Sequence, residues 1–304
     1  MSKYVLKRIL YSILTLFIVI TLTFFLMNAI PGGPFNNERN TEQIVQMMNE
    51  KYGLDKPLGV QYVNYMKQLF KGDLGISFTR KGFTVNEIIG EKFPVSARLG
   101  VVAAGLAVVL GIPAGVVSAL KRNSILDRAI MFVSTLGIAL PSFIVASLLM
   151  YFLCIKYKIF PTVGLKTAGS YVLPAFSLAF FPMSYVARMM RSNMLDVLGQ
   201  DYIRTARAKG LQPFFVLFKH ALRNSIIPVI TYLGPAIAGI LTGGFVVEKI
   251  FSIPGLGQYF INSITARDYP MVMGTTIFLA ALVIMMNFLV DILYSVIDPR
   301  IKYD

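Results

Sequence analysis

Few residues in this sequence are of types that could do chemistry. Its one cysteine, Cys154, and its one histidine, His220, cannot form a disulfide within the chain, a cysteine cluster or a metal site built on several histidines. The sequence has no Gly-x-x-x-x-Gly-Lys-Ser/Thr loop for a nucleotide phosphate, and neither His-Glu-x-x-His nor Gly-x-Ser-x-Gly for hydrolysis. We therefore expect no catalytic residue, no metal site and no cofactor on this chain.

The polar segment 201–228 lies between two long uncharged runs and has the pattern of two short helices. Asp201 can cap a helix N-terminus, Gly210 suits a helix C-terminus, and Pro213 can open a second helix. The basic residues of the segment are Arg204, Arg207, Lys209, Lys219 and Arg223. The segment therefore predicts two helices joined at a glycine.

The first of these helices, of about eight residues, is too short to be stable alone, because isolated helices need roughly 12–15 residues. We expect it to dock through a small apolar face of Ile203, Ala206 and Gly210 with basic residues at the rim, as a helix in a partner's groove does. His220, in the second helix, could titrate near neutral pH. A packing or hydrogen-bonding role is favoured for it over pH sensing.

The composition indicates what surrounds this segment. Of 304 residues, 56% are hydrophobic and only 14% are charged, whereas about a quarter of the residues in soluble domains are charged. The net charge of +14 does not indicate nucleic-acid binding, because the basic residues are spread around apolar runs. Tryptophan is absent, so tyrosine must supply the interfacial aromatic belt. The chain is expected to be a polytopic protein in a lipid bilayer.

Six uncharged runs are long enough to span a bilayer as helices, which need roughly 17–25 residues. They are Ile9–Ile30, Leu99–Leu120, Ala129–Ile155, Thr167–Ala187, Asn224–Val247 and Tyr269–Val290. The first follows three basic residues but is too long for a signal peptide, so we expect an uncleaved helix. Prolines within the later runs predict kinks in a packed bundle. The expected fold class is an all-α polytopic membrane protein with six transmembrane helices.

Residues 31–93 form the one long polar segment and predict an external helical lobe after the first spanning helix. Apolar residues at helical spacing predict one helix that ends at Gly53 and another that starts after Pro57. Thr84 and Glu87 fit a capping box that opens a further helix. Two roles are open for the lobe, a packed structural segment and a docking surface for an external substrate-binding protein.

The basic residues of short loops predict the orientation. Both termini and the loops 121–128 and 188–223 together hold fifteen Lys and Arg, whereas the opposite short loops hold five. Such residues stay in the cytoplasm, so both termini and segment 201–228 are expected there. We divide the chain into residues 1–30 with the first helix, the lobe at 31–93, and a five-helix core at 94–304 that includes loop 188–227.

Segment 201–223 resembles the coupling loop, or EAA loop, of permease subunits of ATP-binding-cassette (ABC) importers. The family pattern is Glu-Ala-Ala, three residues, Gly, nine residues and Ile-x-Leu-Pro. Here it falls on Arg204-Thr205-Ala206, on Gly210 and on His220-Ala221-Leu222-Arg223. The second alanine, the glycine and the leucine match, while the glutamate and the proline are replaced by arginines.

Further motifs extend the resemblance almost from end to end. They are Pro31-Gly-Gly-Pro-Phe35, Tyr52-Gly-Leu-Asp-Lys-Pro57, His220-Ala-Leu-Arg-Asn224, Ile253-Pro-Gly-Leu-Gly257 and Ile297-Asp-Pro-Arg300. With these motifs the chain looks like the first permease subunit of oligopeptide importers. Dipeptide or nickel importer permeases share most of the motifs, and a proton-coupled carrier is the alternative from another class.

The resemblance implies a type I (MetI-like) ABC importer permease core in a bacterial cytoplasmic membrane. It also implies a heterodimer with a second homologous permease subunit, two cytoplasmic ABC ATPase subunits that hold ATP and Mg²⁺, and an external peptide-binding protein. The resemblance assigns contact with the ATPase to ten residues. They are Ile203, Arg204, Thr205, Ala206, Arg207, Gly210, Leu211, His220, Leu222 and Arg223.

A path for mixed peptides should be wide, with few specific polar contacts. The candidates are polar residues of the later helices: Ser177, Ser184, Thr231, Tyr232, Thr242, Thr275, Thr276 and Asn287. Asp291 is the one acid in the last apolar stretch, near its cytoplasmic end. We expect it to pair with a basic residue or with water, since intramembrane acids face protein or water, with a proton relay as the alternative.

Overall fold

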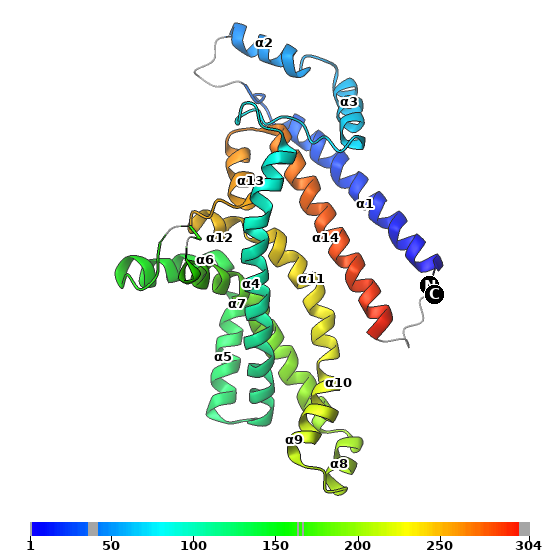
Figure 1. Ribbon diagram of the computed structural model, residues 1–304, viewed down its shortest axis with the longest axis vertical. Helices are drawn as coiled ribbons and strands as arrows, with labels where there is room; N and C mark the ends of the chain where they lie inside the picture. Colours follow the sequence, from blue (N-terminus) through cyan, green and yellow to red (C-terminus); the bar gives the residue numbers. More distant parts are fainter. Residues whose placement is uncertain (1, 36–41, 163, 166, 298–304) are drawn as a thin grey trace. The chain divides into compact units, whose positions relative to one another are not determined.

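The computed structural model describes residues 2–35, 42–162, 164–165 and 167–297, and these residues are mostly helical (Figure 1). The first helices are α1 (Ser2–Ala29), α2 (Glu42–Tyr52), α3 (Leu58–Phe70) and α4 (Val85–Leu120). Next come α5 (Ile125–Ala139), α6 (Ser142–Leu149), the π-helix η1 (Met150–Lys156) and α7 (Ala168–Leu198). They are followed by α8 (Asp201–Ala208), α9 (Pro213–Phe215), the π-helix η2 (Val216–Leu222), α10 (Arg223–Ser225) and α11 (Ile227–Gly243). The last three are α12 (Phe245–Ile250), α13 (Leu256–Thr265) and α14 (Tyr269–Ile297). The all-α class is confirmed.

Five stretches of helix are long and apolar enough to cross a bilayer. They are Leu6–Ala29, Val85–Leu120, Ala168–Leu198, Ile227–Ile250 and Tyr269–Leu289. The remaining expected span, over residues 129–155, is not one helix, because α5 and the α6–η1 pair differ in direction by 109°. Six crossings result only if this bent pair counts as one span, so the prediction of a single kinked helix here is wrong.

Pro141 explains the break between α5 and α6. A residue before proline is pushed out of the helical region, and Leu140 has the extended angles φ −92° and ψ 124°. Pro141 itself has ψ 142° and stands as the N-cap of α6. Two consecutive residues are therefore non-helical, which turns the chain instead of only kinking it.

The predicted lobe helices are present, but the last of them does not stop at the lobe. α2 ends at Tyr52, directly before Gly53, which has φ +69°, and α3 begins directly after Pro57. The Thr84 hydroxyl accepts from the Glu87 backbone N–H at 3.2 Å, and the Glu87 carboxylate accepts from the Thr84 N–H at 2.9 Å, so the capping box is confirmed. The helix that it opens, α4, continues without a break to Leu120.

The chain forms two compact units. The first contains the residues up to Val95 together with Pro254–Met285, and the second contains Ser96–Ile253 with the end of α14. In the first unit, Phe24 of α1, Tyr65 of α3 and Met273 of α14 share a buried cluster. In that unit α3 is therefore packed on membrane-spanning helices instead of hanging free.

A buried carboxylate holds the loop of residues 77–79 in the first unit. Asp268, between α13 and α14, is fully buried and accepts from the Ser77 hydroxyl, the Phe78 N–H (3.1 Å) and the Thr79 N–H (3.1 Å). It also accepts from the Thr79 hydroxyl at 2.7 Å and from the Met271 N–H, in the first turn of α14, at 3.3 Å. One acid thus joins the loop of residues 77–79 to the start of α14, and nothing in the sequence pattern indicated this contact.

α7 is the central helix of the second unit, because α5, α6, α11 and α12 all pack on it. α4 also approaches it closely, since a Cβ at Gly115 would lie 2.5 Å from the Ala187 carbonyl oxygen and 2.6 Å from Met190 Cβ. Only glycine lets the two backbones come this near, as is usual where membrane helices pack.

One ion pair with a buried carboxylate joins three helices of this unit at one end. Asp127 of α5 accepts from Arg191 of α7, Nε to Oδ1 at 2.7 Å and Nη2 to Oδ2 at 2.9 Å. The Ser118 hydroxyl of α4 and the Asn123 backbone N–H, at 2.8 Å, complete the shell of donors around the carboxylate. The pair sets the register of α4, α5 and α7 at the end that the loop charges assign to the cytoplasm.

Candidate coupling site

The first predicted helix of the coupling segment is present as α8, and it ends as the sequence predicts. Gly210 has φ +75°, in the left-handed region, and its N–H donates to the Arg207 carbonyl at 3.0 Å. The Leu211 N–H donates to the Ala206 carbonyl at 3.4 Å, which completes a Schellman motif. A Cβ at residue 210 would meet no atom within 4 Å, so the demand for glycine is conformational and not steric.

The start of α8 differs from the prediction by one residue. The N-cap is Gln200, which makes no capping bond with its side chain, and Asp201 lies in the first helical turn. Its charge still favours the positive end of the helix dipole there. Asp201 also pairs with Arg204 at 3.4 Å, but both side chains are exposed, so the pair contributes little to stability.

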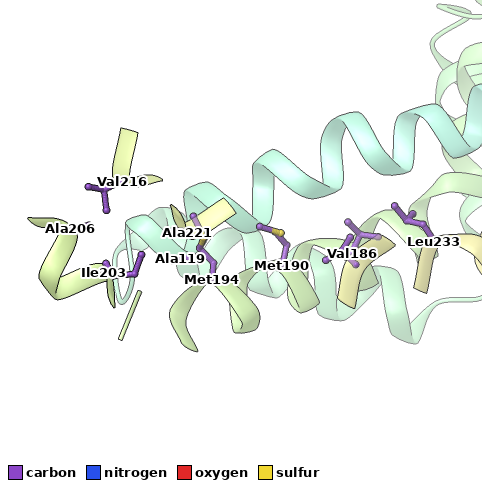
Figure 2. Close-up of a cluster of buried hydrophobic side chains, with 10 residues drawn as sticks. Ala119, Val186, Met190, Met194, Ile203, Ala206, Val216, Ala221 and Leu233 are labelled. Carbon is purple, nitrogen blue, oxygen red and sulfur yellow. The ribbon is translucent and has the colours of Figure 1, made fainter. Parts of the chain in front are cut away.

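The apolar face of α8 is buried inside this chain and is not free for a partner. Ile203 is fully buried and Ala206 is 6% exposed, in one cluster with Val216 of η2 and Met194 of α7. Figure 2 shows Ile203, Ala206 and Val216 at one end of this cluster. The cluster continues along α7 through Met194 and Met190, and Leu233 of α11 lies at its other end. The prediction that this face enters a partner's groove is corrected, because a helix this short is held by packing on its own chain.

The opposite side of α8 is exposed and basic. Tyr202, Arg204, Thr205 and Arg207 are all exposed there. The Tyr202 hydroxyl accepts from the Asn224 amide at 2.8 Å, which links α8 to the second helix of the segment. The surface available to a partner is therefore the polar side of α8.

The second helix starts at Pro213 as predicted, but most of it is π-helical. α9, η2 and α10 follow one another from Pro213 to Ser225, and α11 begins after a turn at Ile226. π-Helical turns inside helices are frequent at functional sites. Among the assigned residues of this part, His220 and Leu222 are half-buried, whereas Leu211 and Arg223 are exposed.

Most of the hydroxyl groups among the proposed path residues donate hydrogen bonds within their own helices. Ser177 and Thr275 are fully buried and donate to carbonyls of their own helices. Thr231 and Thr276 also donate to carbonyls four residues earlier, at 3.0 Å and 2.8 Å, and Thr276 belongs to the other compact unit. Ser184 is buried, and its hydroxyl has no partner among the described residues.

The three remaining path candidates are Tyr232, Asn287 and Thr242. Tyr232 is half-buried and its ring lies 4.3 Å from that of Tyr185 between centroids. Asn287 is half-buried with no partner for its amide oxygen among the described residues. The side chains of Thr242 and Asp291 lie outside the described residues.

A pocket of about 480 Å³ lies where α5 breaks into α6. Its walls are Leu140 and Pro141 at the break, Phe181 and Pro182 of α7, and Tyr232 of α11. Only Tyr232 was among the polar candidates, because the wall is mostly apolar. Prolines inside the spanning runs were the sequence signal that could have found it, since both Pro141 and Pro182 line the pocket.

Comparison with known proteins gives the family. Residues 111–303 match the family described as binding-protein-dependent transport system inner membrane component, and residues 1–100 match the model of its N-terminal region. The chain is 49% identical over 303 residues to the dipeptide transport system permease protein DppB of Bacillus subtilis, which covers 99% of this chain and 98% of that one. It is 45% identical over 306 residues to the oligopeptide transport system permease protein OppB of Haemophilus influenzae, with all of both chains covered.

A solved structure of similar fold is an inward-facing MetNI methionine ABC transporter. The TM-score is 0.57 at 18% identity, with 69% of this chain and 96% of that chain covered. At this identity the likeness concerns the fold alone, and it supports the expected MetI-like core. Together with its apolar spans, these matches show that the chain belongs to the binding-protein-dependent transport system inner membrane component family, as a multi-pass permease subunit of the cytoplasmic membrane and not an enzyme.

Proposed function

We propose that this chain is the permease subunit of an ATP-driven peptide importer and forms half of its translocation path. The observation that carries the proposal is the hairpin from α8 through Gly210 to η2, with a basic exposed side and a buried apolar side. Similarity over the whole length to both dipeptide and oligopeptide permeases supports peptides as the cargo.

The buried cluster suggests how a movement of α8 reaches the membrane. Ile203, Met194, Met190 and Leu233 belong to one apolar cluster that joins α8, α7 and α11 (Figure 2). Packed interiors have low compressibility, so a displacement of α8 moves α7 and α11 with it. Both of these helices line the pocket at Tyr232. We propose that this linkage opens and closes the pocket in alternating access.

The coupling residues divide into two groups under this proposal. The exposed residues Arg204, Thr205, Arg207, Leu211 and Arg223 contact the ATPase. The buried or half-buried residues hold the hairpin in shape and transmit its movement; they are Ile203, Ala206, His220 and Leu222. Gly210 ends α8 and sets the angle of the hairpin.

The partners follow from the family. We propose two cytoplasmic ATPase subunits, which bind ATP and Mg²⁺ in place of this chain, and an external peptide-binding protein. A second, homologous permease subunit would complete a heterodimer. Residues 31–93 would lie outside the cell and both termini inside.

Uptake in a strain that lacks its own peptide permease tests the cargo. Cells with the complete transporter should accumulate labelled dipeptides and oligopeptides, and unlabelled peptide should compete. Competition by Ni²⁺ but not by peptide would favour a nickel importer. A dipeptide preference would place the chain with the dipeptide permeases.

Thiol labelling tests the orientation, because the native Cys154 is buried. A membrane-impermeant reagent added outside should reach single cysteines at Val45 and Leu165, which lie in the predicted outer segments. It should miss cysteines at Arg122 and Thr205 until the cells are opened. The reverse pattern would refute the proposed orientation.

A further inference from the structure

Three phenylalanine side chains stand exposed at the start of the second coupling helix. Phe214, Phe215 and Phe218 are 65%, 54% and 49% exposed, although phenylalanine is usually buried. The Phe214 ring lies between the other two: its centroid is 4.4 Å from that of Phe218 and 6.5 Å from that of Phe215. None of the three is part of the buried cluster around Val216. We call them the aromatic patch.

Lipid is a poor cover for this patch, because the patch lies too far along the helix from the membrane span. Phe214 precedes Ile227, the first residue of the spanning stretch, by thirteen residues. Hydrogen bonds from Ile226 N to Leu222 O (3.0 Å) and from Ile230 N to Ile226 O (2.9 Å) carry the helix across the junction. At about 1.5 Å per residue, Phe214 lies up to about 20 Å before the span. The headgroup layer is only about 5–7 Å thick on each side.

The surface next to the patch is continuous with the exposed side of α8. η2 packs on α8, and the Asn224 amide donates to the Tyr202 hydroxyl at 2.8 Å. The exposed charged residues of this surface are Asp201, Arg204, Arg207, Lys209, Lys219 and Arg223. Five of these six are basic, so a partner that covers both helices should carry acidic residues around an apolar hollow.

We propose that the aromatic patch of Phe214, Phe215 and Phe218 is a second docking surface for the ATPase subunit, beside the exposed side of α8. It fits an apolar hollow with an acidic rim. The proposal rests on the proposed function, since it requires an ATPase partner. Under this proposal, the aromatic patch binds the ATPase, while α8 and Gly210 transmit the movement of the ATPase to the membrane helices. Large aromatic side chains at the centre of an interface often dominate its binding energy.

The test is the double variant Phe214→Ser/Phe218→Ser in the complete transporter. Both side chains are exposed and lie outside the buried cluster around Val216, so membrane abundance of the permease should be unchanged. Titration of purified ATPase subunit onto permease in nanodiscs should show binding weakened by about tenfold or more, as for loss of a hot spot. The conservative variant Phe214→Leu/Phe218→Leu should recover most of the affinity, because it keeps apolar area.

Ile125→Ser is the matched control. Ile125 is 85% exposed at the start of α5, and it lies outside the coupling segment, so its variant should bind the ATPase normally. Normal ATPase binding by the double serine variant would overturn the patch proposal while leaving the proposed function intact. Equal loss in the Ile125 control, or loss of membrane abundance instead of ATPase binding, would also overturn it. If the wild-type permease binds no ATPase, the proposed function itself fails.

Discussion

Substitution of Gly210 should separate the shape of the coupling hairpin from the folding of the membrane domain. Residue 210 has φ +75°, and a side chain there would meet no neighbouring atom within 4 Å. The cost of Gly210→Val is therefore the left-handed backbone alone, about 1–2 kcal/mol. A change of that size alters a population by a factor of about 5–30. Gly210→Asn should cost less, because asparagine tolerates this conformation.

A second glycine beside α8 provides the control. Gly199 follows α7 with φ −81°, which any residue adopts, and the nearest atom to its Cβ position is a carbonyl oxygen at 3.5 Å. Gly199→Ala should therefore leave transport unchanged.

The assay is ATP hydrolysis stimulated by peptide-loaded binding protein, in proteoliposomes that contain the whole transporter. For Gly210→Val we expect normal membrane abundance and stimulated hydrolysis lowered about 5–30-fold, with Gly210→Asn in between. Equal activity of Gly210→Val and Gly199→Ala would refute the role assigned to the end of α8.

Three further predictions concern buried polar and apolar contacts. Asp127→Asn should lower the detergent melting temperature, because it leaves the Arg191 guanidinium, whose side chain is 25% exposed, without its ionic partner at a cost of roughly 1–3 kcal/mol. A second change of Arg191→Met should restore part of the melting temperature, and an unchanged melting temperature in the single variant would contradict this. Ala206→Glu puts an acid on the buried face of α8, so it should make the hairpin more sensitive to protease, whereas wild-type resistance would show that this face is not packed. Asp268→Ala leaves five donors without their acceptor, so amide exchange at residues 77–79 should quicken, and unchanged exchange would speak against the carboxylate's role.

Local sequence signals predicted the helices and their ends well. The capping box at Thr84, the left-handed glycine at the end of α8 and the helix start at Pro213 each depend on neighbouring residues only. The six apolar runs also follow from the sequence, because their length and lack of charge are local properties. The cost of a left-handed backbone or of an unpaired amide in lipid does not depend on distant contacts.

What depends on distant contacts was missed or wrong. The ion pair of Asp127 and Arg191 joins residues 64 positions apart, and Asp268 binds a loop about 190 positions earlier. The apolar face of α8 was assigned to a partner, because the sequence does not tell whether Ile203 is covered by another chain or by its own. At Pro141 the sequence predicts a kink, whereas the chain turns by 109° and α6 packs on α7 and α12.

The central claim is that this chain moves peptide only when ATPase partners hydrolyse ATP. The direct measurement is uptake of a labelled peptide into proteoliposomes that hold this permease, its second permease subunit and the ATPases, with loaded binding protein on the side of residues 31–93. We predict uptake that needs ATP, stops when this chain is omitted and is unaffected by collapse of the proton gradient. Uptake driven by a proton gradient without ATP or ATPase subunits would contradict the account and make the chain a proton-coupled carrier.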